Sequence, residues 1–79
     1  MITGEQIRAA RALLRLEQVE LAASAGLSLP TVQRIEATRG TVSTTTRTLE
    51  ALRRAIRDAG AELIDGDDER GPGVRLRAP

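Results

Sequence analysis

The chain has 79 residues, a length that predicts one small domain, and it contains no cysteine, histidine, phenylalanine, tyrosine or tryptophan. These absences exclude disulfides, thiolate or imidazole metal sites, cysteine or serine–histidine catalysis, and modules that stack single-stranded bases on aromatic rings. No apolar run approaches the ~20 residues of a membrane span, and the N-terminus lacks the layout of a signal peptide. We therefore expect a cytoplasmic domain that is not an enzyme, contacts no membrane and needs no cofactor or metal.

The net charge of +1 is unevenly distributed. Residues 1–59 contain nine arginines and six acidic residues, whereas residues 60–79 contain three arginines and five acidic residues. All twelve basic residues are arginine, whose planar guanidinium group suits phosphates and the edge of guanine. Codon usage in a GC-rich genome would produce the same bias, so the charge by itself does not identify the partner.

Capping signals and glycine place the first two helices. Thr3 and Gln6 have the spacing of a capping box, and apolar residues then recur at helical spacing, which predicts a helix over 4–14. A second, short helix begins at Glu17 and ends at Gly26, because glycine adopts without strain the left-handed conformation that closes a helix.

Two further helices are predicted in the same way. Ser28 is a favourable N-cap, and Pro30 stands in the first turn, where its missing amide hydrogen is not needed; both predict a helix over 29–36. An apolar stripe predicts the longest helix over 45–59, and Gly60 closes it.

The remaining residues have the pattern of a β-hairpin. Short strand-like runs at 61–65 and 74–77 flank a turn-rich acidic loop at 66–73. Alternating acidic residues near this loop resemble a calcium site, but Arg70 stands where such a site needs glycine, so no metal site is predicted. We expect a DNA-binding part at 1–60 and a dimerisation element at 61–79.

The segment 18–36 carries the most information about function. Two short helices joined by a tight turn that contains glycine form the pattern of a helix-turn-helix, whose second helix can enter the major groove of DNA. Nine spaced residues make this pattern more specific: Gln18, Leu21, Ala22, Gly26, Leu27, Ser28, Val32, Ile35 and Glu36. Through these residues, and over residues 5–59, the chain resembles the lambda repressor and Cro type of helix-turn-helix protein, the XRE family. The resemblance implies a mainly α-helical, lambda-repressor-like bundle of about four helices, here followed by the C-terminal β-hairpin.

The sequence departs from the family pattern at two places. Glu17 stands where the family commonly caps the second helix with serine or threonine, although a carboxylate also suits a helix N-terminus. The family often has five helices, whereas the last two are merged here, and this difference concerns the dimer interface more than the DNA-binding half.

The resemblance also implies roles for individual residues. Gln18 matches a position that holds a DNA phosphate, and Arg34 and Gln33 match positions that contact base edges or flanking phosphates. Chemically, arginine suits guanine and glutamine suits adenine, whereas Leu29 and Pro30 can only contact thymine methyl groups. The residues expected to contact double-stranded DNA are Gln18, Ser28, Leu29, Pro30, Thr31, Gln33, Arg34, Arg39 and Thr41. Each of them would, taken alone, also fit an ordinary solvated surface position.

Two further groups are expected to have structural roles. The family pairs an arginine of the first helix with the glutamate at the end of the third, so we expect a partly buried ion pair between Arg11 and Glu36. Dimer contacts are expected at four apolar residues of the hairpin, through strand pairing, face packing or both: Leu63, Ile64, Val74 and Leu76. The competing interpretation is that the hairpin folds back on its own last helix.

Together these patterns predict a homodimeric, sequence-specific transcriptional regulator, most simply a repressor that reads the major groove with helix 29–36. The alternative is a protein-interaction module, such as an antitoxin or anti-activator, built on the same helix-turn-helix scaffold.

Overall fold

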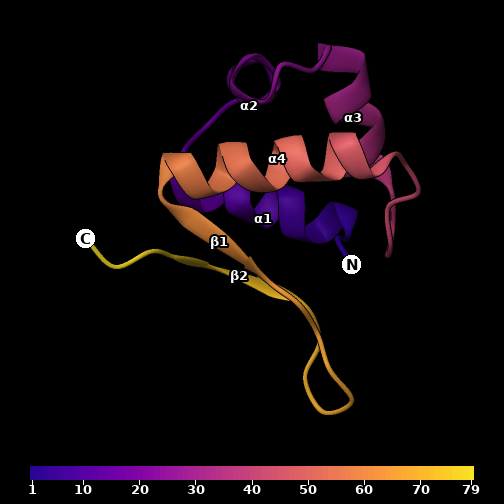
Figure 1. Cartoon of the computed structure of the whole chain (residues 1–79), viewed down its shortest axis with the longest axis vertical. Coiled ribbons are helices and arrows are strands. Elements are labelled where there is room, and N and C mark those ends of the chain that lie inside the picture. Colours follow the sequence, from indigo (N-terminus) through magenta and orange to yellow (C-terminus); the bar gives the residue numbers. More distant parts are fainter.

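The computed structural model describes all 79 residues, of which about 53% are helical. Its elements are α1 (Gly4–Leu14), α2 (Gln18–Ala25), α3 (Leu29–Ala37), α4 (Thr46–Ala59), β1 (Ala61–Ile64) and β2 (Gly73–Leu76). In Figure 1, α4 crosses in front of α1. Helices α2 and α3 lie on one side of this pair, and the hairpin extends on the other side. The mainly α-helical architecture with a C-terminal antiparallel hairpin is therefore confirmed. No helix is both long and apolar enough to span a membrane.

Local capping explains why the helix limits agree with the sequence patterns to within one residue. The Oγ1 of Thr3 accepts a hydrogen bond from the Gln6 amide at 3.1 Å, and Gln6 Oε1 accepts one from the Thr3 amide at 2.8 Å. The hydroxyl oxygens of Ser28 and Thr45 cap α3 and α4 by accepting from the amides of Thr31 and Thr48, without the reciprocal bond seen at Thr3. Gly26 ends α2 at φ +68°, in the left-handed region that glycine adopts without strain.

The core is entirely aliphatic. Its fourteen buried apolar residues come from all four helices, from β1 and from the N-terminal and α3–α4 segments. The largest of the fully buried side chains are Ile2, Ile7, Leu21, Ile35, Leu52, Ile56 and Val32. The backbones at Gly4 and Thr38 also lie close together. A methyl group on Gly4 would lie only 2.1 Å from the carbonyl oxygen of Thr38, so this contact requires glycine. The start of α1 thus lies directly against the end of α3.

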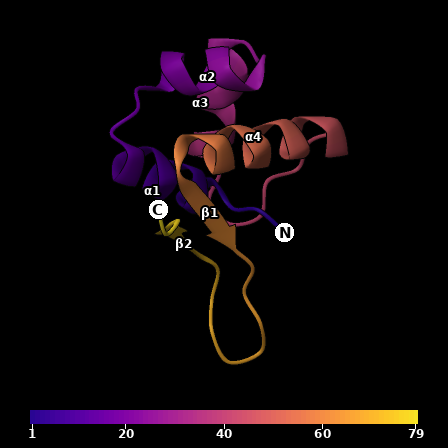
Figure 2. The same cartoon turned by 60° about the vertical axis from the view of Figure 1, so that its left-hand side comes forward.

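The hairpin packs against helices of its own chain. β1 lies against α4 and β2 against α1 (Figure 2), and the strands pair antiparallel with Ala61 opposite Leu76 and Leu63 opposite Val74. Ala61 and Leu63 belong to the same core as the helices. Within one chain, the hairpin therefore folds back on the helices, as in the second of the two interpretations given for it in the sequence analysis.

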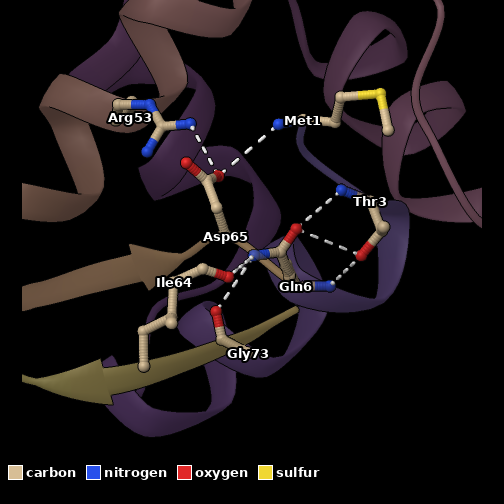
Figure 3. A network of polar contacts seen from close by, with 7 residues as sticks. All are labelled: Met1, Thr3, Gln6, Arg53, Ile64, Asp65 and Gly73. Carbon is tan, nitrogen blue, oxygen red and sulfur yellow. Dashed lines mark hydrogen bonds and ion pairs between the residues drawn. The ribbon is translucent and has the colours of Figure 1, made fainter. Parts of the chain in front are cut away.

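A buried glutamine fixes the hairpin to α1. Nε2 of Gln6 donates hydrogen bonds to the carbonyl oxygens of Ile64 at 2.9 Å and Gly73 at 3.0 Å, which face each other where the two strands open into the loop (Figure 3). Its Oε1 accepts the hydrogen bond from Thr3 described above. One side chain thereby joins the start of α1 to both strands.

Candidate nucleic-acid interface

The two helices of the predicted motif meet through small and branched apolar side chains. Leu21 and Ala22 of α2 are buried, and the Leu27 amide donates to the Ala22 carbonyl at 2.9 Å, so the chain turns tightly around Gly26. Figure 2 shows α2 and α3 together on the side of α4 that lies away from the hairpin. This turn orients α3 so that one of its faces packs on the core and the other is free.

The free face of α3 is a stripe at helical spacing. The exposed residues of this stripe are Pro30, Gln33, Arg34 and Ala37, and the buried residues opposite are Val32, Ile35 and Glu36. Neither Gln33 nor Arg34 makes a side-chain hydrogen bond or an ion pair within the chain, as the hydrogen bonds in this region all involve other groups. We call these four exposed residues the α3 stripe.

The polar residues at the start of α3 are engaged with each other. Ser28 Oγ accepts from the Thr31 amide at 3.2 Å and lies 2.8 Å from Thr31 Oγ1. Both hydroxyl groups remain at the surface, beside the half-exposed Leu29. Ser28 therefore acts as the N-cap, and its exposed hydroxyl still has capacity to bind a further group.

A buried carboxylate holds the other end of α3. Glu36 is only 2% exposed, and its two oxygens accept hydrogen bonds from Arg11, from Nε at 2.7 Å and from Nη2 at 2.9 Å. Arg11 also donates to the Leu16 carbonyl at 3.0 Å, and the guanidinium of Arg8 donates to the Glu36 carbonyl. The hydrogen bonds to Glu36 raise the pKa of Arg11 further above its already high value. The ion pair expected from the sequence is thus present as a bidentate contact between α1 and α3.

Gln18 also contacts the carboxylate of Glu36. Its Nε2 donates to Glu36 Oε1 at 3.2 Å, so the first residue of α2 is joined to the last turn of α3. The side chain is half-buried, and an amide carries two donors, so one N–H is left for another acceptor. The position therefore keeps the donor that a phosphate contact requires.

Arg39 and Thr41 lie beyond the C-terminal end of α3, on the segment that leads to α4. Both are exposed, and Thr41 forms an isolated bridge with Thr3 beside the N-terminus. Between them the Gly40 amide donates to Glu5 Oε1 at 3.0 Å; hydrogen bonds from the Glu5 amide and from Gly40 lower the pKa of Glu5. Since α3 spans about 13 Å, these two residues lie at the opposite end of the motif from Ser28.

The four hairpin residues predicted to make dimer contacts occupy different environments. Leu63 is 9% exposed and lies in the core, and Val74 packs against it, so both stabilise the fold of one chain. Ile64 is half-buried, and Leu76 is 56% exposed. Leu76 is thus the only one of the four that is mainly exposed, while Ile64 and Val74 each keep part of their surface accessible.

Three features of this region were not predicted from the sequence. Ala37 completes the α3 stripe, and its position seven residues after Pro30, which places both on one helix face, could have predicted this. Arg8 precedes Arg11 by three residues and therefore shares its helix face. The bond between Gln18 and Glu36 has no local signal, because it depends on how three helices meet.

No protein-family model matches the chain, and no curated protein matches it significantly.

Proposed function

We propose that this chain is a sequence-specific double-stranded DNA-binding protein with a lambda-repressor-like fold, and that it acts as a homodimeric transcriptional repressor in the cytoplasm. The observation that carries the proposal is the α3 stripe. A short helix buries one face, exposes the other, and presents a glutamine and an arginine that the protein itself leaves without partners. Such side chains suit the hydrogen-bonding edges of bases in the major groove.

The chemistry of the stripe indicates what each residue would contact. Arg34 carries two donors in a fixed geometry that fits O6 and N7 of guanine, and Gln33 has the donor and acceptor that fit adenine. Pro30 and Ala37 offer apolar surface for the methyl group of thymine. Phosphate contacts would come from polar groups that flank the stripe, above all Gln18, Thr31 and Arg39.

The decisive experiment separates base contacts from phosphate contacts. Duplexes that the protein selects from a random pool, together with the DNA upstream of its own gene, are titrated beside shuffled duplexes over a salt series. We expect preferential binding whose affinity falls steeply with salt, because several phosphates release counterions when they are neutralised. Loss of the guanine contact in Arg34→Ala should weaken binding to the selected site about 5–150-fold, equivalent to about 1–3 kcal/mol, with little change on shuffled DNA.

A matched variant controls for charge. Arg54 is exposed on α4 and makes no ion pair, so Arg54→Ala removes the same charge at a distance from the stripe. It should weaken binding to selected and shuffled duplexes by similar, small factors. Absence of binding to any duplex at low salt, or equal effects of the two variants on discrimination, would contradict the proposal.

One observation favours a second candidate function. Pro30 and Ala37 make part of the exposed stripe apolar, Leu29 is half-exposed beside it, and the net charge is only +1. An interaction module such as an antitoxin or anti-activator would use this surface to bind another protein. Its binding would depend weakly on salt, whereas DNA binding would depend on it steeply.

A further inference from the structure

The outer face of α4 carries three arginines that have no ionic partner in the chain. Arg47, Arg54 and Arg57 are exposed, and none of them forms an ion pair. Their spacing of seven and three residues places them on one face of the helix, opposite the buried Leu52 and Ile56. Figure 1 shows no other element in front of α4. We call Arg47, Arg54 and Arg57 the α4 arginine row.

The side chains of the row line an open groove of about 320 Å³. The residues that line it are Arg47, Glu50, Ala51, Arg54 and Arg57. Because a helix rises about 1.5 Å per residue, the groove extends about 15 Å along α4. Glu50 lies between Arg47 and Arg54 on this face and forms an ion pair with neither. The groove therefore combines three unpaired positive charges with one unpaired negative charge.

Arg47 stands at a position where the helix itself disfavours a positive charge. It lies in the first turn of α4, which contains no acidic residue. The positive end of the helix macrodipole is at this turn, so acidic side chains stabilise it and basic ones do not. The fold thus gains nothing from the charge of Arg47. Residues that break a local rule without a gain to the fold are expected at functional surfaces.

The charge pattern favours a protein segment with carboxylates as the partner of this groove. A guanidinium group binds a carboxylate or a phosphate through two parallel hydrogen bonds. A nucleic acid carries only negative charge, so Glu50 within the groove and Asp58 beyond it on the same helix face would repel the phosphates. A protein segment can instead place a basic residue opposite Glu50 and carboxylates opposite the arginines, which neutralises the whole groove.

We propose that the α4 arginine row is the docking site for an acidic helix of a different protein. A helix repeats its side chains at the same spacing as α4, so three of its carboxylates can reach the three arginines while one basic residue reaches Glu50. In an antiparallel arrangement the carboxylates stand at its first, fourth and eleventh positions, and the basic residue stands at the eighth. Each exposed ion pair contributes little, so specificity comes from the pattern as a whole.

The chain itself does not contain a segment that matches the groove. No helix of the chain carries three acidic residues. The acidic residues of the hairpin loop are consecutive, at 67–69, and Asp67 Oδ1 already accepts hydrogen bonds from the amides of Glu69 at 2.8 Å and Arg70 at 2.7 Å. These observations favour a different protein over a second copy as the occupant.

The test uses the full chain without DNA and a short synthetic helical peptide with this charge pattern, three glutamates and one lysine. Nuclear magnetic resonance detects weak binding and assigns it to individual residues. We expect the α4 amide signals to shift with a dissociation constant in the millimolar range that rises with salt, because salt screens exposed charges. A control peptide exchanges the first glutamate with the lysine, so that lysine faces Arg57 and glutamate faces Glu50. It should bind at least threefold more weakly, since like charges then face each other.

Two variants locate the contact. Arg54→Gln should weaken binding of the matched peptide at least threefold. Arg15→Gln alters an exposed arginine without an ion pair at the end of α1 and should leave this binding unchanged. The inference goes beyond the proposed function, because the α4 arginine row and the α3 stripe are on different helices. Failure of the peptide to bind leaves the DNA-binding proposal standing, and the reverse also holds.

Four results would overturn the proposal. The first is absence of shifts in α4 at millimolar concentrations of the matched peptide, and the second is equal binding of the two peptides. The third is an equal response of the same α4 signals to inorganic phosphate, which would show a site for any anion. The fourth is a shift of these signals with the concentration of the protein alone that is lost in Asp68→Asn, which would show that a second copy occupies the groove.

Discussion

Replacement of Arg11 by methionine should destabilise the domain rather than act on a partner directly. The variant removes both guanidinium hydrogen bonds to Glu36 and the one to the Leu16 carbonyl, and leaves Gln18 as the remaining donor to the carboxylate. Breaking one side of a buried ion pair costs about 3–5 kcal/mol. The Glu36 side chain is 3% exposed but that of Arg11 is 25% exposed, so solvent already screens part of the interaction and about 3 kcal/mol is expected.

For a domain of this size, 1 kcal/mol shifts the melting temperature by roughly 4–8 °C, so Arg11→Met should melt about 12–24 °C lower. Circular dichroism of the helices is the suitable probe, because the chain has no tryptophan or tyrosine for fluorescence. Arg54→Met, which alters an exposed arginine without an ion pair, should melt within a few degrees of the parent. The double variant Arg11→Met/Glu36→Leu should recover part of the loss, because it leaves no unpaired buried charge.

One result would refute this reasoning. If Arg11→Met melted like the parent protein while its affinity for DNA fell, the guanidinium would be a phosphate ligand and the contact with Glu36 would not support the fold.

Two other predictions concern the contacts around the start of α1. Gly4→Ala would place a methyl group against the Thr38 carbonyl and should destabilise the domain by roughly 1–3 kcal/mol in denaturant titrations, whereas Gly71→Ala, with no atom nearby, should be neutral. Glu5 has a pKa lowered from 4.5, so its charge stabilises the folded state above that pH, and this contribution is lost as the pH falls through the folded pKa. Glu5→Gln should therefore melt below the parent at neutral pH, and the gap should shrink in acid; a gap independent of pH would contradict this role.

Helix limits could be predicted because their determinants are local. Thr3, Ser28 and Thr45 each cap the helix that follows, and Gly26 and Gly60 each end the one before, so short sequence windows contain the information. The two deviations at helix starts have a common cause. Glu17 and Thr45 were expected as the first residues of α2 and α4 but are their N-caps, the position that the family pattern also gives to Glu17; an N-cap and a first helical residue differ only in backbone angles.

The hairpin illustrates what local patterns leave open. Alternation in the sequence predicts strands at 61–65 and 74–77; in the structure the first ends one residue earlier, as Ala61–Ile64, and the second is shifted by one residue, to Gly73–Leu76. Apolar residues on a strand are equally compatible with the domain's own core and with a second chain, so Leu63 and Leu76 could not be distinguished. Gln6 shows the same limit, because its capping role is local but its bonds to Ile64 and Gly73 connect residues far apart in sequence.

Because of the contacts around Glu36, the conformational entropy of the α3 backbone is lost when the chain folds and not when a partner binds. Arg11 from α1 and Gln18 from α2 both hold this carboxylate, and Arg8 holds the carbonyl of the same residue, so α3 cannot tilt without breaking contacts to two other helices. A partner that binds the α3 stripe therefore meets a backbone that folding has already immobilised, and only surface side chains such as Gln33 and Arg34 remain to be ordered. If the surfaces do not match in shape, the partner must therefore deform. If the partner is a DNA duplex, the energy needed to bend it depends on its sequence, and this energy then contributes to the choice among binding sites.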